Sequence, residues 1–219
     1  MWVPPTPNTA RGERRHLSDR LHITFMRHGR SRADDENVHE GHYDSPLTDM
    51  GRTQALARAD DFAGRAMHFD AIVASTLARA HETATIVGDV LGVAVEADPD
   101  WPEMNSGLLA GLPFDVAAER FPPPVFRNPY EPYVVTGESD WEIYCRAARA
   151  VENVVRRGSG SYLVVAHGGI LNAALRTIFD IGPRINAQGI AFYFGDTGFA
   201  RLEYGPSRHC WGLVEFREG

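Results

Sequence analysis

Three apolar stretches along the chain each lead into a side chain that can bind phosphate. They are residues 23–26, followed by Arg27 and His28; residues 71–75, followed by Arg79; and residues 162–166, followed by His167. Short apolar runs that end in polar residues are typical of buried strands. Because ligands bind beyond the carboxyl ends of parallel strands, we expect these side chains to meet in one pocket.

The spacing of apolar residues elsewhere predicts helices that alternate with these strands. Helices are expected after the N-cap residues Thr48 and Thr76 and over residues 114–121, 141–157 and 168–179. The first should bury Leu56, Ala59, Phe62 and Ala63, and the second should end at Gly92. The second apolar stretch should form a strand over residues 69–74, and further strands are expected over residues 93–95, 190–195, 199–204 and 211–216, with a turn at residues 196–198. This alternation predicts a three-layer α/β/α sandwich with a mostly parallel central sheet.

The 219 residues suit one domain. Residues 1–20 are rich in Pro and Arg without an apolar core segment, and we expect a flexible N-terminal tail rather than a signal peptide. Residues 21–219 would form the domain. Within it, residues 101–136 hold seven prolines, a composition typical of a cap-like insertion that faces a substrate.

Composition narrows the class of protein. Apolar residues make up 43%, charged residues 23%, and the net charge is −7, which argues against nucleic acid or an anionic membrane as partner. All 22 basic residues are arginines. Cys145 and Cys210 are too few for a disulfide framework or a cysteine metal site. A cytoplasmic enzyme is the default expectation, and edge strands near the C-terminus could pair in a homo-oligomer.

Each candidate side chain also has an ordinary interpretation when it is taken alone. His28 could be a loop residue, His167 could cap the following helix, and Arg79 could pair with Glu82 on a helix surface. Together, two arginines and two histidines suit a phosphoryl group that imidazole attacks, with charge on its oxygens neutralised by guanidinium groups. Glu103 could then protonate the leaving group and later activate water.

The order of these motifs resembles the histidine phosphatase superfamily, branch 1, which is also called phosphoglycerate mutase-like. The matching residues are Arg27-His28-Gly29, Gly41, Asp44, Pro46-Leu47-Thr48, Gly51, Ser75, Arg79-Ala80, Thr83-Ala84, Glu103, Gly137-Glu138-Ser139 and Ala166-His167-Gly168-Gly169. The resemblance spans about residues 21–216.

The resemblance implies a role for each matching position. His28 would become the phosphohistidine, and Glu103 would act as general acid and then base. Arg27, Arg79 and His167 would hold the phosphoryl oxygens. Ser31, Gly41 and the backbone at Gly168 would contribute to substrate binding. The resemblance implies neither a metal ion nor another cofactor, and the run from His39 to His42 lacks the spacing of a helical zinc motif.

The chain departs from the family pattern after the first histidine. Arg30 stands where Glu or Gln is usual, and Asp34 stands where Asn is usual, although Asn37 could serve if the loop shifts. Arg30 could bind a second anionic group of the substrate or pair with the neighbouring acids, and pairing is favoured. Residues 105–111 also differ from the family pattern.

The family contains both phosphatases and mutases. The mutases carry a basic insertion that retains a bisphosphate intermediate, whereas residues 105–136 hold only Arg120 and Arg127 among many aromatics. We therefore expect a metal-independent phosphomonoesterase acting on a small phosphorylated metabolite. A mutase-type phosphotransferase remains an alternative, as does a non-catalytic sensor or scaffold that binds phosphorylated ligands.

Overall fold

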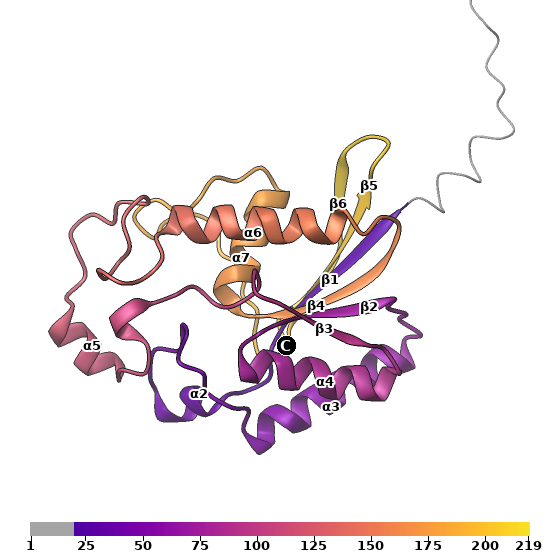
Figure 1. The fold of residues 1–219 in the computed structure, drawn as a ribbon, viewed down its shortest axis with the longest axis horizontal. Coiled ribbons are helices and arrows are strands. Elements are labelled where there is room, and N and C mark those ends of the chain that lie inside the picture. Colours follow the sequence, from indigo (N-terminus) through magenta and orange to yellow (C-terminus); the bar gives the residue numbers. More distant parts are fainter. Residues whose placement is uncertain (1–19) are drawn as a thin grey trace, which may run out of the picture.

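A six-stranded sheet forms the centre of the computed structural model, which describes residues 20–219 (Figure 1). The predicted tail lies outside the described residues, apart from Arg20. The strands are β1 (Leu21–Arg27), β2 (Ala71–Ser75), β3 (Val95–Asp98), β4 (Gly160–Ala166), β5 (Phe199–Gly205) and β6 (Cys210–Arg217). Their order is β3-β2-β4-β1-β5-β6; the first four are parallel, and β5 and β6 form an antiparallel hairpin at one edge.

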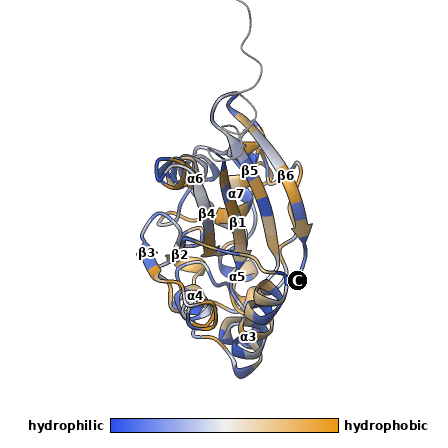
Figure 2. Ribbon diagram, turned by 90° about the vertical axis from the view of Figure 1, so that its right-hand side faces the viewer, coloured by the Kyte–Doolittle hydropathy of each residue, from blue (hydrophilic) through white to orange (hydrophobic). Residues whose placement is uncertain are grey.

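Helices cover both faces of the sheet, as the predicted three-layer sandwich requires. The helices α3 (Asp49–Gly64) and α4 (Ala78–Leu91) lie on one face, and α6 (Asp140–Val155) and α7 (Gly168–Ile178) lie on the other (Figure 1). Successive residues of a strand point to opposite faces. Phe25 and Val164 accordingly join the core under α6 and α7, whereas Met26 and Val165 join the core under α3 and α4. Figure 2 shows the central strands β1 and β4 as largely hydrophobic.

The long connection between β3 and α6 contains a 3₁₀ turn, η1 (Gly107–Leu109), and a short helix, α5 (Phe114–Arg120). In Figure 1, α5 projects from the end of the molecule that is remote from the β5–β6 hairpin. Leu109, Ala117 and Val134 form a small apolar cluster of their own within this segment. The cluster gives the connection a packed structure over the carboxyl ends of the strands.

The strand expected over residues 190–195 is wrong. The side chain of Asn172 holds this segment instead, because its amide donates to the Phe192 carbonyl at 2.8 Å and its oxygen accepts from the Phe192 N–H at 2.7 Å. The neighbouring position in the sheet is already filled, since β5 pairs with β1. The predicted turn does form, with Gly198 N–H donating to the Gly195 carbonyl at 2.9 Å.

Several element boundaries also differ from the prediction. Helix α4 begins at Ala78 rather than after Thr76, because the distant Asp44 carboxylate accepts from Ala78 N–H at 2.7 Å and caps the helix. Strand β3 begins at Val95, because Val93 N–H still bonds back to the helix. A short helix, α2 (Arg32–Glu36), forms between β1 and α3, in a segment for which no helix was predicted.

Other helix predictions are confirmed in outline. Thr48 is the N-cap of α3, accepting from Gly51 N–H at 3.0 Å, and Gly92 ends α4 in a left-handed conformation. The apolar face of α3 differs from the expected one, since Ala55 is buried whereas Leu56 is 48% exposed. Among residues 20–219, no helix is long and apolar enough to cross a membrane.

Candidate active site

The two histidines that follow β1 and β4 lie beside one another. These strands are adjacent and in parallel register, so that Arg27 pairs with Ala166 at their carboxyl ends. The backbone N–H of His28 continues the ladder by donating to the Ala166 carbonyl at 3.0 Å. The rings of His28 and His167 are fully buried, with their centroids 5.0 Å apart. The adjacency of two strands therefore brings together residues that are 139 positions apart in sequence (167 minus 28).

The surroundings of His28 leave one of its ring nitrogens unprotonated. Nδ1 lies 2.7 Å from the Gly29 carbonyl, which can only accept, so Nδ1 carries the proton. Nε2 accepts from Nε of Arg79 at 3.2 Å. Burial holds the pKa of His28 well below its usual value, and the charges of Arg27 and Arg79 lower it further. The ring is therefore neutral near pH 7, and its unprotonated Nε2 is chemically able to act as a nucleophile.

Arg79 is fixed beside this nitrogen by its remaining hydrogen bonds. Its side chain is fully buried, and its two terminal nitrogens donate to the carbonyls of Tyr43 and Gly41, each at 3.0 Å. Glu82, the alternative partner of Arg79, pairs instead with Arg52 at 2.6 Å. Arg79 thus holds both the 41–43 loop and the nucleophile.

His167 has one ring nitrogen with a partner and one without. Its Nε2 lies 2.8 Å from the Ser75 hydroxyl at the end of β2, whereas its Nδ1 is buried with no hydrogen-bond partner among residues 20–219. Burial, and then the neighbouring His28 and Arg79, hold the pKa of His167 well below its usual value. An unpartnered buried nitrogen is costly, and a ligand atom in the site would satisfy it.

Glu103 occupies the N-terminus of α7. Its carboxylate accepts from Gly169 N–H at 2.9 Å, from Ile170 N–H at 3.1 Å and from Met104 N–H at 2.7 Å. A Cβ at position 169 would lie 2.3 Å from a Glu103 oxygen, so the glycine permits this approach. A helix N-terminus favours negative charge. The acidic side chain that lies at this helix end is that of Glu103.

A cavity of about 310 Å³ lies beside these groups, although His28, Arg79 and His167 are fully buried and do not line it. Arg27, Glu103 and Gly168 contribute to its wall, together with Glu40. The Arg27 guanidinium donates to the Phe194 carbonyl at 3.2 Å and lies 3.4 Å from Asp196.

Glu40 was not among the predicted site residues. Its carboxylate accepts a hydrogen bond from Ser31 and lies 3.5 Å from Nε of Arg79 and 3.7 Å from Nε2 of His28. Burial raises the pKa of Glu40, and the nearby Asp34 raises it further against the opposing effect of Arg79. A carboxylate therefore lies among the side chains that the sequence predicted to bind a phosphoryl group. Its place depends on the fold of the 37–46 loop, and the sequence offered no separate signal for it.

Gly41 and Arg30, which the sequence also predicted to bind substrate, have different contacts in the structure. Gly41 has a positive φ of 47°, and a Cβ there would lie 2.0 Å from the Ser106 hydroxyl, so a larger side chain would displace the loop that Arg79 holds. Arg30 does not reach the cavity. Its Nε donates to Asp35 at 2.7 Å, which is the pairing that the sequence favoured over substrate binding.

The Gly137-Glu138-Ser139 motif helps to fix the backbone around Glu103. Glu138 pairs with Arg146 through two hydrogen bonds of 2.7 and 2.6 Å and accepts from Asn105 N–H at 2.8 Å. Arg146 also donates to the carbonyls of Pro102 and Glu103, at 2.7 and 3.2 Å. This network fixes the backbone on both sides of Glu103 to helix α6.

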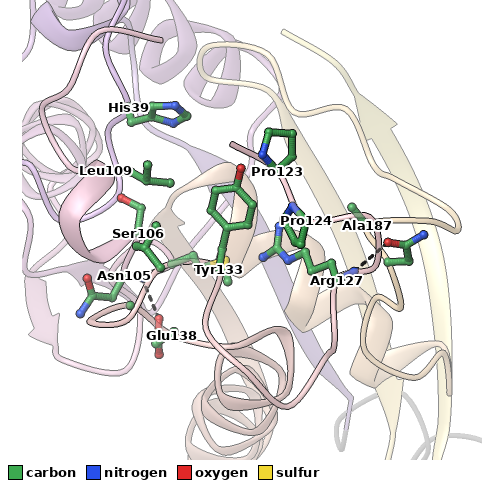
Figure 3. Close-up of a pocket in the computed structure, with 14 residues that line it drawn as sticks. His39, Asn105, Ser106, Leu109, Pro123, Pro124, Arg127, Tyr133, Glu138 and Ala187 are labelled. Atoms are coloured by element: carbon green, nitrogen blue, oxygen red, sulfur yellow. Dashed lines mark hydrogen bonds between the residues drawn. The ribbon is translucent and has the colours of Figure 1, made fainter. Parts of the chain in front are cut away.

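A second cavity of about 510 Å³ lies within the long connection beside residues 104–106 (Figure 3). Tyr133 stands in it between Ser106 on one side and Pro124 and Arg127 on the other. Carbon atoms make up most of its wall. The hydroxyl of Tyr133 is engaged by the Phe121 carbonyl at 3.2 Å. Among residues 20–219, no group of three or more His, Cys, Asp or Glu side chains is arranged to hold a metal ion.

Comparison with known proteins places this site in a defined family. The family model of the histidine phosphatase superfamily (branch 1) matches residues 23–216. The chain therefore belongs to this superfamily, as its motifs indicated.

Relatives and solved structures agree with this assignment. A Yersinia enterocolitica protein named "Probable phosphoglycerate mutase GpmB" is 29% identical over 167 residues, which are 74% of this chain and 77% of that protein. A Hydrogenobacter thermophilus protein named as a phosphoserine phosphatase is 31% identical over 163 residues, 73% of this chain and 79% of that protein. The structure of a mycobacterial glucosyl-3-phosphoglycerate phosphatase, in complex with VO3, matches with a TM-score of 0.76 at 24% identity, covering 90% of this chain and 99% of that one. That structure supports the fold.

Proposed function

We propose that the protein is a metal-independent phosphatase that hydrolyses the phosphomonoester of a small metabolite through a phosphohistidine at His28. The observation that carries the proposal is the state of the His28 ring. It is buried and neutral, with its proton on Nδ1 and the lone pair of Nε2 beside the Arg79 guanidinium. The names of relatives, which include a phosphoserine phosphatase, support hydrolysis of this class of substrate.

In the first step, Nε2 of His28 attacks phosphorus and the bond between phosphorus and the ester oxygen breaks. Arg27, Arg79 and the unpartnered Nδ1 of His167 would hold the three non-bridging oxygens as charge shifts among them. Glu103 lines the same cavity and would give its proton to the departing alkoxide.

In the second step, a water molecule attacks the phosphorus of phosphohistidine. Glu103, now ionised, takes the proton from that water, and the bond between nitrogen and phosphorus breaks. The products are inorganic phosphate and neutral His28, which restores the starting state.

A mutase has to retain its bisphosphate intermediate, which needs cationic groups in the cap. Of the two arginines in the cap, Arg127 pairs with Asp140 at 3.0 Å and Arg120 stacks on Phe121. These pairings support hydrolysis over phosphoryl transfer back to the product.

The test is phosphate release from p-nitrophenyl phosphate and a panel of phosphorylated metabolites, with EDTA present. Wild type is compared with His28→Ala. We expect release that survives EDTA and disappears in the variant. No release from any compound by wild type would overturn the proposal, and an added bisphosphate primer would then test the mutase alternative.

A further inference from the structure

Arg176, on the third turn of α7, is a buried cation without an anionic partner. Its residue is 4% exposed, and no carboxylate of residues 20–219 lies within 4.0 Å of its guanidinium. Buried charges in proteins are normally paired, because desolvation of an isolated ion is costly. Arg79, which is equally buried, has Glu40 at 3.5 Å.

The hydrogen bonds of Arg176 use only part of its guanidinium. One terminal nitrogen donates to the Gly182 carbonyl at 2.9 Å and the other to the Ile190 carbonyl at 2.5 Å. These bonds fasten the 182–190 segment to α7, which is a structural role. They leave Nε without a partner and give the positive charge no carboxylate within 4.0 Å, so that Asp140 acts on it only from farther away.

A second arginine faces the same pocket. Arg184 and Arg176 both line a pocket of about 350 Å³ beside α7, which we call the α7 pocket. Nε of Arg184 is also buried without a hydrogen-bond partner in the described part of the chain. Burial lowers the pKa of Arg176, and the charge of Arg184 lowers it further. The protein therefore holds two like charges at one pocket, at a cost to Arg176.

The only carboxylate in the wall of the α7 pocket is already engaged. Asp140 lines the pocket, but its Oδ2 lies 3.0 Å from Nε of Arg127 and its Oδ1 accepts from the same arginine at 3.4 Å. Because Asp140 pairs with Arg127, it does not neutralise Arg176 or Arg184. The α7 pocket thus has a net positive charge.

The α7 pocket adjoins the 310 Å³ cavity that lies beside the histidines. Gly168, Asn172, Phe192 and Tyr193 line both spaces. Gly168, Asn172 and Arg176 are spaced four residues apart and so lie along one side of α7. The amide of Asn172 is occupied by the carbonyls of Gly168 and Phe192, so it forms wall rather than a binding group.

We infer that the α7 pocket binds a second anionic group of the substrate, a carboxylate or a phosphate, through Arg176 and Arg184. The substrate would then be a phosphomonoester with an anionic group at its far end. This inference rests on the proposed function and narrows its substrate class. The basic groups that bind the substrate would then lie on α7 and the segment that follows it, outside the cap-like insertion at residues 101–136.

The length of α7 between Gly168 and Arg176 determines how far apart the two anionic groups of such a substrate must be. From Gly168 to Arg176 the axis of α7 rises about 12 Å, and side chains on a helix lean toward its N-terminus. The two anionic groups should therefore lie about 6–10 Å apart.

The test uses alkyl phosphates of three to eight carbons that end in either a carboxylate or a hydroxyl group. For each length we measure kcat/KM of the carboxylate over that of the alcohol. Wild type should prefer the carboxylate by about tenfold or more at the best length, which is the usual worth of a charged hydrogen bond. A ratio near one at every length would overturn the inference.

Substitution identifies the residues responsible. Arg184→Gln should lower the ratio about tenfold, and Arg184→Glu should lower it further by adding repulsion. Arg156→Gln removes an equal charge from the exposed side of α6 and is the matched control, which should keep the wild-type ratio. Arg176→Gln should also lower the ratio, and thermal unfolding would report its structural role separately. An unchanged ratio in folded Arg184 variants would contradict the inference.

A binding measurement separates this inference from the proposed function. Calorimetry with a non-hydrolysable carboxyalkyl phosphonate compares wild type with Arg184→Gln. Binding that weakens in the variant, in a protein that hydrolyses nothing, would support the α7 pocket and refute the phosphatase. Hydrolysis without any preference for the carboxylate would do the reverse.

Discussion

The Glu40 carboxylate lies 3.7 Å from Nε2 of His28, the atom that we assign to nucleophilic attack. An ionised carboxylate at this position opposes the approach of a phosphate dianion, while it partly neutralises Arg79 at 3.5 Å. Protonation of Glu40 would remove the repulsion without removing the side chain. The site therefore contains an internal competitor for the anion that it has to bind.

Glu40→Gln should raise kcat/KM for p-nitrophenyl phosphate at pH 7 by about tenfold, because it removes the repulsion between the carboxylate and the phosphate. A tenfold change corresponds to the free energy of a shift of about one pKa unit. In wild type, burial raises the pKa of Glu40, so kcat/KM should fall as pH rises through that value and Glu40 ionises. The variant should lack this decline. Glu152→Gln, on the exposed side of α6, is the control. A lower kcat/KM in Glu40→Gln at every pH would show that the carboxylate assists the reaction.

Replacement of Glu103 should affect substrates according to their leaving groups. Glu103→Ala should reduce kcat for an alkyl phosphate by about 10²–10⁴-fold, since alkoxide needs a proton as it departs. The same variant should lose far less with p-nitrophenyl phosphate, whose leaving group is stable as an anion. Equal losses for both substrates would show that Glu103 acts in binding or folding instead.

Arg146 positions Glu103 and does not touch the substrate cavity. Arg146→Met should break the paired contact with Glu138, which is 19% exposed, and lower the free energy of unfolding by about 2–3 kcal/mol. In the folded variant, kcat should fall more for alkyl phosphates than for p-nitrophenyl phosphate, because Glu103 is displaced. Loss of stability without this dependence on the leaving group would confine Arg146 to a structural role.

The buried histidines predict how stability depends on pH. Folding lowers the pKa of His28 and of His167, so below about pH 6.5 the unfolded chain binds protons that the folded chain excludes. Each histidine should therefore reduce the free energy of unfolding by up to about 1.4 kcal/mol per unit as pH falls from 6.5. Urea unfolding at pH 7, 6 and 5 measures the slope. The double variant His28→Gln/His167→Gln should show a shallower slope, and an unchanged slope would contradict the assignment.

Much of the fold could be predicted from local patterns. The strands β1, β2 and β4 are continuous apolar runs, and their polar ends converge because parallel strands share an edge. The segment at residues 190–195 has a similar pattern, yet it forms no strand. Its backbone is bound by Asn172, which lies 20 residues away, and local sequence contains no sign of that contact.

The candidate site was predictable where motifs carry it and hidden where it depends on distant contacts. His28, Arg79, His167 and Glu103 follow from ordered motifs. The structure brings the first three into contact and places Glu103 in the wall of the cavity beside them. Glu40 enters the site only because its loop folds back onto Ser31. The sequence shows every arginine, but only the three-dimensional structure shows that Arg176 and Arg184 line a pocket and have no carboxylate within 4.0 Å.

The most direct test of the account is to trap the phosphorylated enzyme. Wild type is mixed with a ³²P-labelled phosphomonoester, quenched within milliseconds in strong base, and digested to find the labelled peptide. The account predicts a label that is stable in base and labile in acid, on the peptide that contains His28, and absent from His28→Ala. Phosphate release by wild type with no such label, or with a label on another residue, would contradict the account.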